Sequence, residues 1–201
     1  MIDYLKKSFD RLPISGKGRE IFNFPNTLTF FRISIIPALF LLLLNPGMVL
    51  SLFIAALFIV AAVTDLLDGY VARRYGIVTA MGKFLDPVAD KLLVSTAMIM
   101  MIPIDRIPAW IVAIMVMRDL FVDGLRSIAS LDGHVIAAGS LGKQKTLAQI
   151  VAVSALLIHY PLFGLNAHAV GIAVLYVALL LSLWSGTDYF MKYHAVVVKN
   201  S

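Results

Sequence analysis

The chain has 201 residues, of which 60% are hydrophobic and only 14% are charged, and its mean hydropathy is +0.90. An ordinary soluble domain carries roughly 25% charged residues, so this composition excludes a typical soluble protein and predicts an integral membrane protein. The formal net charge is +5, and the absence of cysteine from the sequence excludes disulfides and thiolate chemistry.

Residues 1–22 differ in pattern from the rest of the chain. Apolar and basic side chains recur there at helical spacing, the apolar ones being Ile2, Leu5, Phe9 and Leu12 and the basic ones Lys6, Lys7 and Arg11. This pattern predicts an amphipathic helix that lies at the level of the lipid headgroups. A disordered tail is the alternative. A cleavable signal peptide is not predicted, because no apolar core with a small-residue cleavage site follows the basic stretch.

Residues 23–195 contain six apolar runs. A membrane-spanning helix needs roughly 20 mostly apolar residues, and the runs cover approximately 28–45, 49–72, 83–102, 108–130, 145–160 and 165–192. Three of the breaks carry turn-forming residues: Asn45-Pro46-Gly47, Pro103 to Pro108, and Tyr160-Pro161 to Asn166. We therefore predict a single all-α integral membrane domain over residues 1–201, with a six-transmembrane-helix bundle behind an N-terminal amphipathic interfacial helix.

Lysine and arginine are distributed unevenly between the two ends of this predicted bundle. They precede the first run, flank the second and fourth breaks and close the chain, whereas only Arg106 falls at the other end. By the positive-inside rule, both termini and the second and fourth breaks are expected to be cytoplasmic. No transit peptide is evident, so a bacterial inner membrane is the expected location.

Four aspartates lie beside the second break. Asp65 and Asp68 end the second run and Asp86 and Asp90 open the third, so each helix is expected to carry one pair at helical spacing. Four carboxylates that face one another repel strongly unless cations neutralise them. All-oxygen ligands, with no histidine nearby, favour Mg²⁺ or Mn²⁺, and Mg²⁺ usually completes its shell with substrate phosphate. The pattern predicts two divalent cations that assist a displacement at phosphorus.

This aspartate frame resembles the signature of the CDP-alcohol phosphatidyltransferase family. These membrane enzymes pass a phosphatidyl or similar group from a CDP-linked donor to an alcohol and release CMP. All eight fixed positions of the signature are present: Asp65, Asp68, Gly69, Ala72, Arg73, Gly82, Asp86 and Asp90.

The resemblance implies a role for each matching residue. Asp65, Asp68 and Asp86 are expected to bind the two metals, and Asp90 is expected to be both a metal ligand and the catalytic base for the acceptor hydroxyl. The CDP-lipid, CDP-diacylglycerol, is expected to contact a further set: Asn26, Thr29, Gly69, Arg73 and Thr79. Within this set Asn26 and Thr29, with Arg32, look like an opening motif of the family, although a helix cap with a snorkelling arginine is an alternative. A homodimer in the lipid bilayer is also implied.

Four basic residues flank the fourth break, on the same predicted side as the aspartates: Arg118, Arg126, Lys143 and Lys145. Such a set suits a phosphate on the acceptor, and the alternative is positive-inside topology with local ion pairs. The stretch from Gly142 to Thr146, together with Met117-Arg118-Asp119, is similar to the branch of the family that uses glycerol 3-phosphate. Glycerol 3-phosphate is therefore the expected acceptor, and Asp119 is interpreted as an arginine partner rather than a metal ligand.

Two alternatives stay open on the sequence. A sister transferase would use inositol phosphate or another alcohol with the same donor. A cation transporter would also place acidic groups beside membrane spans, but here the aspartates gather at one side and do not mark a path across the bilayer. No nucleic-acid partner is expected.

Overall fold

The computed structural model describes residues 24–75, 80–134, 136, 139–162 and 164–198, with the side chains of 32–64, 88–134, 136, 139–162 and 164–196. The interfacial helix predicted for residues 1–22 lies outside the described residues.

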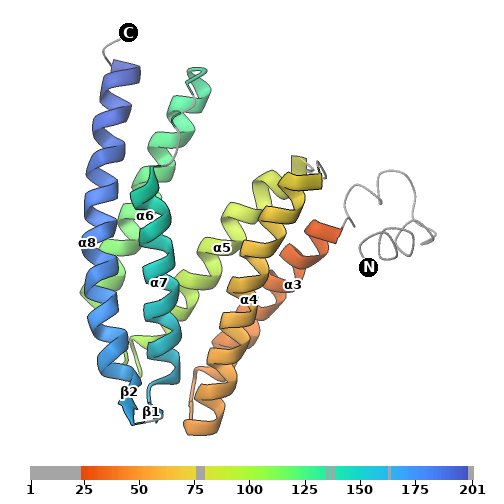
Figure 1. Cartoon of the computed structure of the whole chain (residues 1–201), viewed down its shortest axis with the longest axis vertical. Coiled ribbons are helices and arrows are strands. Elements are labelled where there is room, and N and C mark those ends of the chain that lie inside the picture. Colours follow the sequence, from red (N-terminus) through yellow and green to blue (C-terminus); the bar gives the residue numbers. More distant parts are fainter. Residues whose placement is uncertain (1–23, 76–79, 135, 137–138, 163, 199–201) are drawn as a thin grey trace, which may run out of the picture.

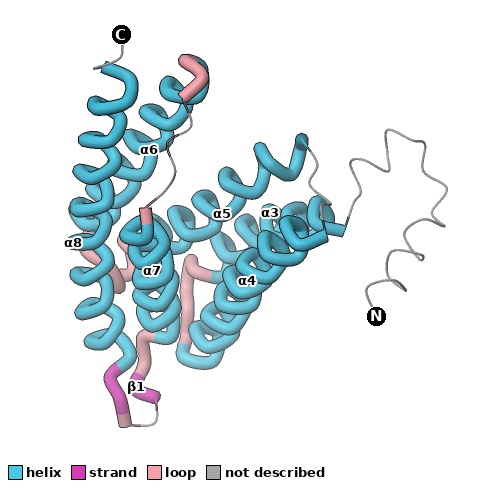
Figure 2. Tube along the Cα trace, turned by 45° about the horizontal axis from the view of Figure 1, so that its top comes forward, coloured by secondary structure: helices cyan, strands magenta, loops and turns pink. Residues whose placement is uncertain are grey.

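Six long helices make up most of the described chain, and their bounds follow the six predicted apolar runs closely (Figure 1). They are α3 (Phe24–Leu42), α4 (Met48–Tyr75), α5 (Ala80–Met101), α6 (Ala109–Leu131), α7 (Ser140–Ile158) and α8 (Ala167–Tyr193). A short antiparallel hairpin, β1 (Pro161–Leu162) and β2 (Leu165–Asn166), connects α7 to α8 (Figure 2), and a π-helical turn, η1 (His194–Val198), follows α8. The described chain is thus mostly helical, as the sequence predicts.

The helices end where the sequence places turn-forming residues. Pro108 lies at the N-cap of α6 with φ −66°, the value that its ring imposes. Asn166 caps α8, where its side chain accepts a hydrogen bond of 3.1 Å from the amide of Ala169. Gly164, with φ +80°, supplies the left-handed residue of the β1–β2 turn. The predicted breaks before α4, α6 and α8 are therefore confirmed.

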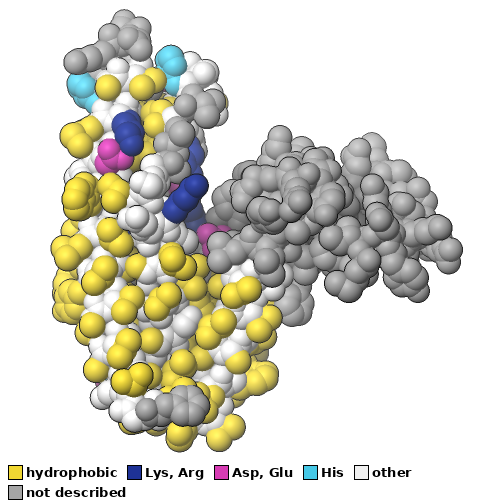
Figure 3. Space-filling view, viewed as in Figure 1, with side chains coloured by type: hydrophobic (Ala, Val, Ile, Leu, Met, Phe, Trp, Pro, Cys, Tyr) yellow, Lys and Arg dark blue, Asp and Glu magenta, His cyan; other side chains and the backbone are white. Residues whose placement is uncertain are grey.

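Much of the apolar surface of the helices faces outward. Among the described residues, one helix, Ala167–Val196, is long and apolar enough to cross a membrane, with a mean hydropathy of 2.0. Two shorter apolar stretches are Arg32–Leu42 and Met48–Thr64. Figure 3 shows hydrophobic side chains over much of the described part of one face, and large residues such as Leu120 and Leu180 are more than half exposed.

The helices pack in two groups that diverge toward the end of the molecule that carries the C-terminus (Figure 1). Helix α7 lies along α8, α6 also contacts α8, α3 contacts α4 and α5, and α4 reaches α7. A continuous apolar core joins the groups and includes the fully buried Leu39, Phe58, Met98 and Leu156. The site lies in a cavity lined by residues of α5, α6, α7 and α8.

Arg106, the one basic residue predicted for the opposite end, is a buried structural side chain with 3% exposure. Its guanidinium donates to the carbonyl of Leu157 at 2.8 Å, to Ser51 Oγ at 2.8 Å and to the carbonyl of Pro46 at 3.5 Å. It also lies over the Tyr160 ring. Burial lowers the pKa of Arg106 from its ordinary value, and Tyr160 opposes this shift. Arg106 thus ties together the chain segments that meet at this end of the bundle.

Candidate active site

A cavity of about 520 Å³ lies between the middle of α5 and of α6, the first turns of α7 and the last turns of α8. Its charged lining consists of five basic and four acidic side chains: Lys91, Arg118, Arg126, Lys143 and Lys145, and Asp90, Asp119, Asp123 and Asp188. Charged side chains are gathered in the upper part of the face in Figure 3, above the apolar surface. The cavity has room for a small anionic molecule and a positive balance to attract one.

The cavity joins two parts of the sequence that were predicted separately. Asp90, from the aspartate frame on α5, lines it together with all four basic residues predicted for the acceptor. Arg118 and Arg126 come from α6, and Lys143 and Lys145 come from the first turns of α7. A carboxylate proposed as a base and a set of cations therefore line the same cavity.

The other predicted site residues that the structure describes belong to α3, α4 and α5. Asp65, Asp68, Gly69 and Arg73 belong to the last turns of α4, Asp86 belongs to α5, and Asn26 and Thr29 belong to the first turns of α3. The side chains of these seven residues, and Thr79 altogether, lie outside the described residues. Within the described side chains, no group of three or more His, Cys, Asp or Glu residues is arranged to hold a metal ion.

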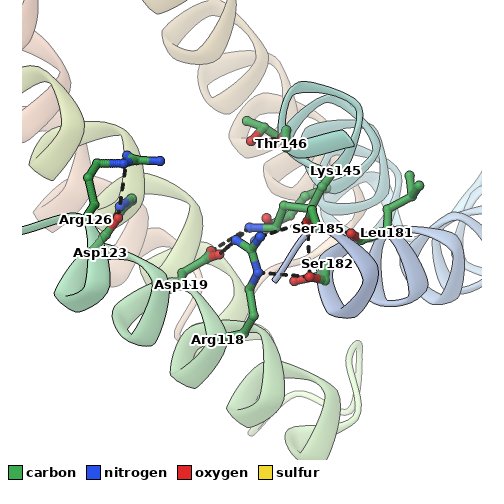
Figure 4. Close-up of polar contacts among 12 residues, drawn as sticks. Arg118, Asp119, Asp123, Arg126, Lys145, Thr146, Leu181, Ser182 and Ser185 are labelled. Atoms are coloured by element: carbon green, nitrogen blue, oxygen red, sulfur yellow. Dashed lines mark hydrogen bonds and ion pairs between the residues drawn. The ribbon is translucent and has the colours of Figure 1, made fainter. Parts of the chain in front are cut away.

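Asp119 is the polar centre of the described part of the site. Lys145 Nζ donates to both of its carboxylate oxygens, at 2.7 and 2.6 Å, and Arg118 Nη1 donates to Oδ1 at 2.9 Å (Figure 4). The interpretation of Asp119 as an arginine partner is confirmed. Asp119 also pairs with Lys145, which is only 5% exposed.

Arg118 is held on its other side by α8. Its Nε donates to the carbonyl of Ser182 at 2.9 Å and its Nη2 donates to Ser185 Oγ at 2.8 Å. A Cβ on Gly186 would lie 3.1 Å from Arg118 Nε and 3.3 Å from its Cγ, so the glycine leaves room for this side chain. The sequence did not single out these α8 residues as part of the site. Their signal is a pair of hydroxyls followed by glycine in an otherwise apolar helix, a pattern common where membrane helices pack closely.

The remaining charged residues of the cavity are held less firmly. Lys91 pairs with Asp123, and Arg126 Nη1 lies 3.9 Å from Asp123 Oδ1 with the guanidinium over the Tyr189 ring. The Arg126 side chain is 49% exposed. Lys143 is exposed and has no ion-pair partner among the side chains that the structure describes. Arg126 and Lys143 thus have the most unused donor capacity.

A family model described as CDP-alcohol phosphatidyltransferase matches residues 22–184. The chain belongs to this family. A relative from Bacillus subtilis is 44% identical over 184 residues, which cover 86% of this chain and 95% of the relative. Relatives from Rickettsia typhi and Shigella flexneri are 36% and 42% identical over 169 and 175 residues, covering 84% of this chain in both cases and 95% and 93% of the relatives. All three are named CDP-diacylglycerol–glycerol-3-phosphate 3-phosphatidyltransferase.

In this CDP-alcohol phosphatidyltransferase, the matched range contains the whole eight-position signature and the cavity walls formed by α5, α6 and α7. The wall formed by α8, with Ser185, Asp188 and Tyr189, lies just beyond it. The family resemblance predicted from the signature is confirmed. The α8 contribution to the site is visible only in the structure.

Proposed function

We propose that the protein transfers a phosphatidyl group from CDP-diacylglycerol to glycerol 3-phosphate, giving phosphatidylglycerophosphate and CMP. The observation that carries this proposal is the shared cavity, in which Asp90 lies together with Arg118, Arg126, Lys143 and Lys145. The names of the relatives from Bacillus subtilis, Rickettsia typhi and Shigella flexneri support the same reaction.

The acceptor is proposed to lie in this cavity with its phosphate against the basic residues. A phosphate dianion requires charge-assisted donors, and Arg and Lys supply these in complementary geometries. Arg126 and Lys143 are proposed to bind the phosphate directly, because their donors are the least engaged. In this proposal the primary hydroxyl of the acceptor faces Asp90. Inositol phosphate, with the same anionic group, is the second proposed acceptor.

Two divalent cations, Mg²⁺ or Mn²⁺, are proposed to bind at Asp65, Asp68, Asp86 and Asp90. The donor set is made of carboxylate oxygens, which suit hard cations, and the backbone of α4 and α5 is helical at all four positions. Asp90 is the member whose described side chain lines the cavity. When bound, such cations would neutralise the phosphates of the donor and stabilise the charge that develops on the departing CMP.

The residues are proposed to act in the following order. Asn26, Thr29, Gly69, Arg73 and Thr79 contact the CDP part of the donor. The Asp90 carboxylate accepts the proton of the acceptor hydroxyl as that oxygen forms a bond to the phosphorus that carries the lipid. The bond from this phosphorus to the oxygen of CMP breaks, and CMP departs with the electron pair.

The chain is proposed to span a bilayer with its six helices and to place the cavity at the cytoplasmic face of a bacterial inner membrane. The outward apolar side chains of the helices support this arrangement. It keeps the acyl tails of the donor in lipid while the headgroup reaches the cavity. Residues 1–22 are proposed to lie along the headgroups, and the chain is proposed to form a homodimer.

A panel of acceptors tests the proposed function. Purified protein in detergent is given CDP-diacylglycerol, Mg²⁺ and, in separate reactions, glycerol 3-phosphate, inositol phosphate and glycerol, and CMP release is measured. We expect rapid release with glycerol 3-phosphate and little with the other two. Turnover with inositol phosphate and none with glycerol 3-phosphate would overturn the acceptor assignment.

A further inference from the structure

We propose that Asp119 is a positioning residue, which fixes Lys145 and Arg118 as a rigid pair of cations beneath the phosphate of the acceptor. This inference rests on the proposed function, since it concerns the same cavity. It divides the four basic residues into two roles: Lys145 and Arg118 form the fixed pair, and Arg126 and Lys143 are the adjustable contacts.

The contacts of Asp119 define the geometry of the pair. Both carboxylate oxygens accept from Lys145, and Oδ1 accepts from Arg118 as well. Since Lys145 belongs to α7 and Arg118 is anchored on α8 through Ser185, the carboxylate of Asp119 on α6 lies at the junction of three helices. Figure 4 shows the two cationic groups converging on this carboxylate. Neither cation is free to swing, because each has partners on a second helix or is buried.

The charges explain why the pair needs Asp119. Lys145 and Arg118 are side by side with low side-chain exposures of 6% and 15%, where repulsion between cations is weakly screened. One carboxylate between them offsets one positive charge and leaves a net single positive charge in the wall of the cavity. Without Asp119, Lys145 would be a buried cation beside a second cation. Its side chain would then lower its free energy by turning toward solvent.

Two other interpretations of the same contacts make different predictions. If Asp119 merely competed with the acceptor phosphate for Lys145, removal of its charge would improve acceptor binding. If Asp119 served only to hold the three helices together, its removal would change donor and acceptor binding equally, along with stability. A positioning role predicts poorer acceptor binding with donor binding kept.

The experiment compares Asp119→Asn and Asp119→Glu with the wild-type protein. Asn keeps the shape and removes the charge, whereas Glu keeps the charge. From the typical strength of hydrogen bonds to charged groups, we expect Asp119→Asn to raise KM for glycerol 3-phosphate about tenfold or more, with KM for CDP-diacylglycerol changed less than about twofold. Asp119→Glu should recover part of the acceptor affinity. Asp132→Asn is the matched control, because Asp132 is exposed and does not line the cavity.

A lower KM for glycerol 3-phosphate in Asp119→Asn would overturn the proposal in favour of competition. An equal rise in both KM values, without recovery by Glu, would overturn it in favour of a purely structural role. If Asp119→Asn does not fold, Ser185→Ala replaces it, since this change removes only one anchor of Arg118. We then expect a rise of about threefold in the acceptor KM alone, and no rise would overturn the proposal.

The wild-type acceptor panel separates this proposal from the proposed function. If the wild-type protein uses inositol phosphate and not glycerol 3-phosphate, the proposed function fails, and the same variants are measured with inositol phosphate. An acceptor-specific rise in KM then still supports the role of Asp119. If the wild-type protein uses only unphosphorylated alcohols, there is no phosphate to position and both proposals fail.

Discussion

Asp90 connects the two patterns of the sequence, the aspartate signature and the set of four basic residues. It is the last aspartate of the family signature, and its side chain lines the cavity that holds the predicted acceptor cations. A base must reach the proton that it removes, and a place beside the acceptor site meets that requirement. The other three aspartates have no equivalent observation, because their side chains lie outside the described residues.

Asp90→Asn is predicted to abolish transfer while the protein still inserts and folds. An amide cannot accept the proton of the acceptor hydroxyl, and general-base catalysis typically contributes about 10²- to 10⁴-fold to a rate. We therefore expect kcat to fall by at least about a hundredfold, measured as CMP release by purified protein. Asp132→Asn should keep near-normal activity. Near-normal turnover in Asp90→Asn would remove Asp90 from the role of base.

Lys143→Ala is predicted to weaken binding of the acceptor more than binding of the donor. Lys143 lines the cavity, is exposed and lacks an ion-pair partner among the described side chains, so its ammonium group is available for the acceptor phosphate. Loss of one charge-assisted contact corresponds to a rise of about tenfold in the acceptor KM. Steady-state kinetics with each substrate varied in turn measures this. Equal changes in both KM values would indicate that Lys143 contributes only to the orientation of the chain in the membrane.

Residue types and spacing singled out Asp90 and four basic residues that line one cavity, but not the α8 residues that hold Arg118. The basic character of Arg118 and Lys145 and their place at one predicted membrane face made them recognisable. Their joint attachment to Asp119 depends on how the bundle places α6 and α7 relative to each other, because Lys145 and Asp119 are 26 positions apart. Helical spacing within one segment carries no information on such a contact.

At the scale of elements, the close contact between α7 and α8 forms one wall of the site. Gly171 of α8 allows this approach, since a Cβ there would lie 2.8 to 2.9 Å from side-chain atoms of Leu156 and 3.0 Å from its amide nitrogen. Backbone atoms cannot move aside as a flexible side chain can. The position of Lys145 and Gln149 on α7 relative to Ser185 on α8 therefore depends on a glycine several helical turns away.

Gly171→Ala is predicted to destabilise the protein, whereas Gly124→Ala should not. Overpacking typically costs about 1 to 3 kcal/mol, and the methyl group at position 171 would meet Leu156. Gly124 lies in α6, and a Cβ added to it would have no neighbour within 4 Å, so alanine there should be neutral or stabilise the helix. Thermal unfolding in detergent compares the two variants. Equal midpoints would contradict the tight contact between α7 and α8.

The helices themselves were predictable because their cause is local. Apolar runs of sufficient length, ended by Pro, Gly and Asn, predicted the bounds of α3 to α8 to within a few residues. Which helix contacts which was not predictable, because all six runs are apolar on most sides and offer no single face for pairing. The pairing of α3 with α5 and of α4 with α7 is set by packing of side chains distant in sequence.

At the scale of the whole molecule, the distribution of charge has two different explanations. Most of the basic residues whose side chains the structure describes line one cavity, and the positive-inside rule predicts such a gathering of cations at a cytoplasmic face. Arg106, at the other end, is buried and bonded to Leu157, Ser51 and Pro46, so it serves packing. The exception was evident in the sequence, and only the structure explains it.

Labelling of single introduced cysteines is predicted to show that the two ends of the molecule lie on opposite sides of the membrane. The natural chain contains no cysteine, so a single introduced thiol is the only target for a maleimide. Asn45 and Asp132 are both exposed and lie at opposite ends of the bundle. In spheroplasts, a membrane-impermeant maleimide should label Asn45→Cys at once and Asp132→Cys only after permeabilisation. The reverse pattern would contradict a cytoplasmic cavity.

Metal ions and the acceptor are proposed to act together at one site to release CMP. The most direct test measures CMP and labelled phosphatidylglycerophosphate in the same reaction, with purified protein, CDP-diacylglycerol and labelled glycerol 3-phosphate. We predict equal amounts of the two products with Mg²⁺ or Mn²⁺, and neither product after chelation with EDTA or without the acceptor. CMP release that continues at the same rate without metal or without glycerol 3-phosphate would contradict the account.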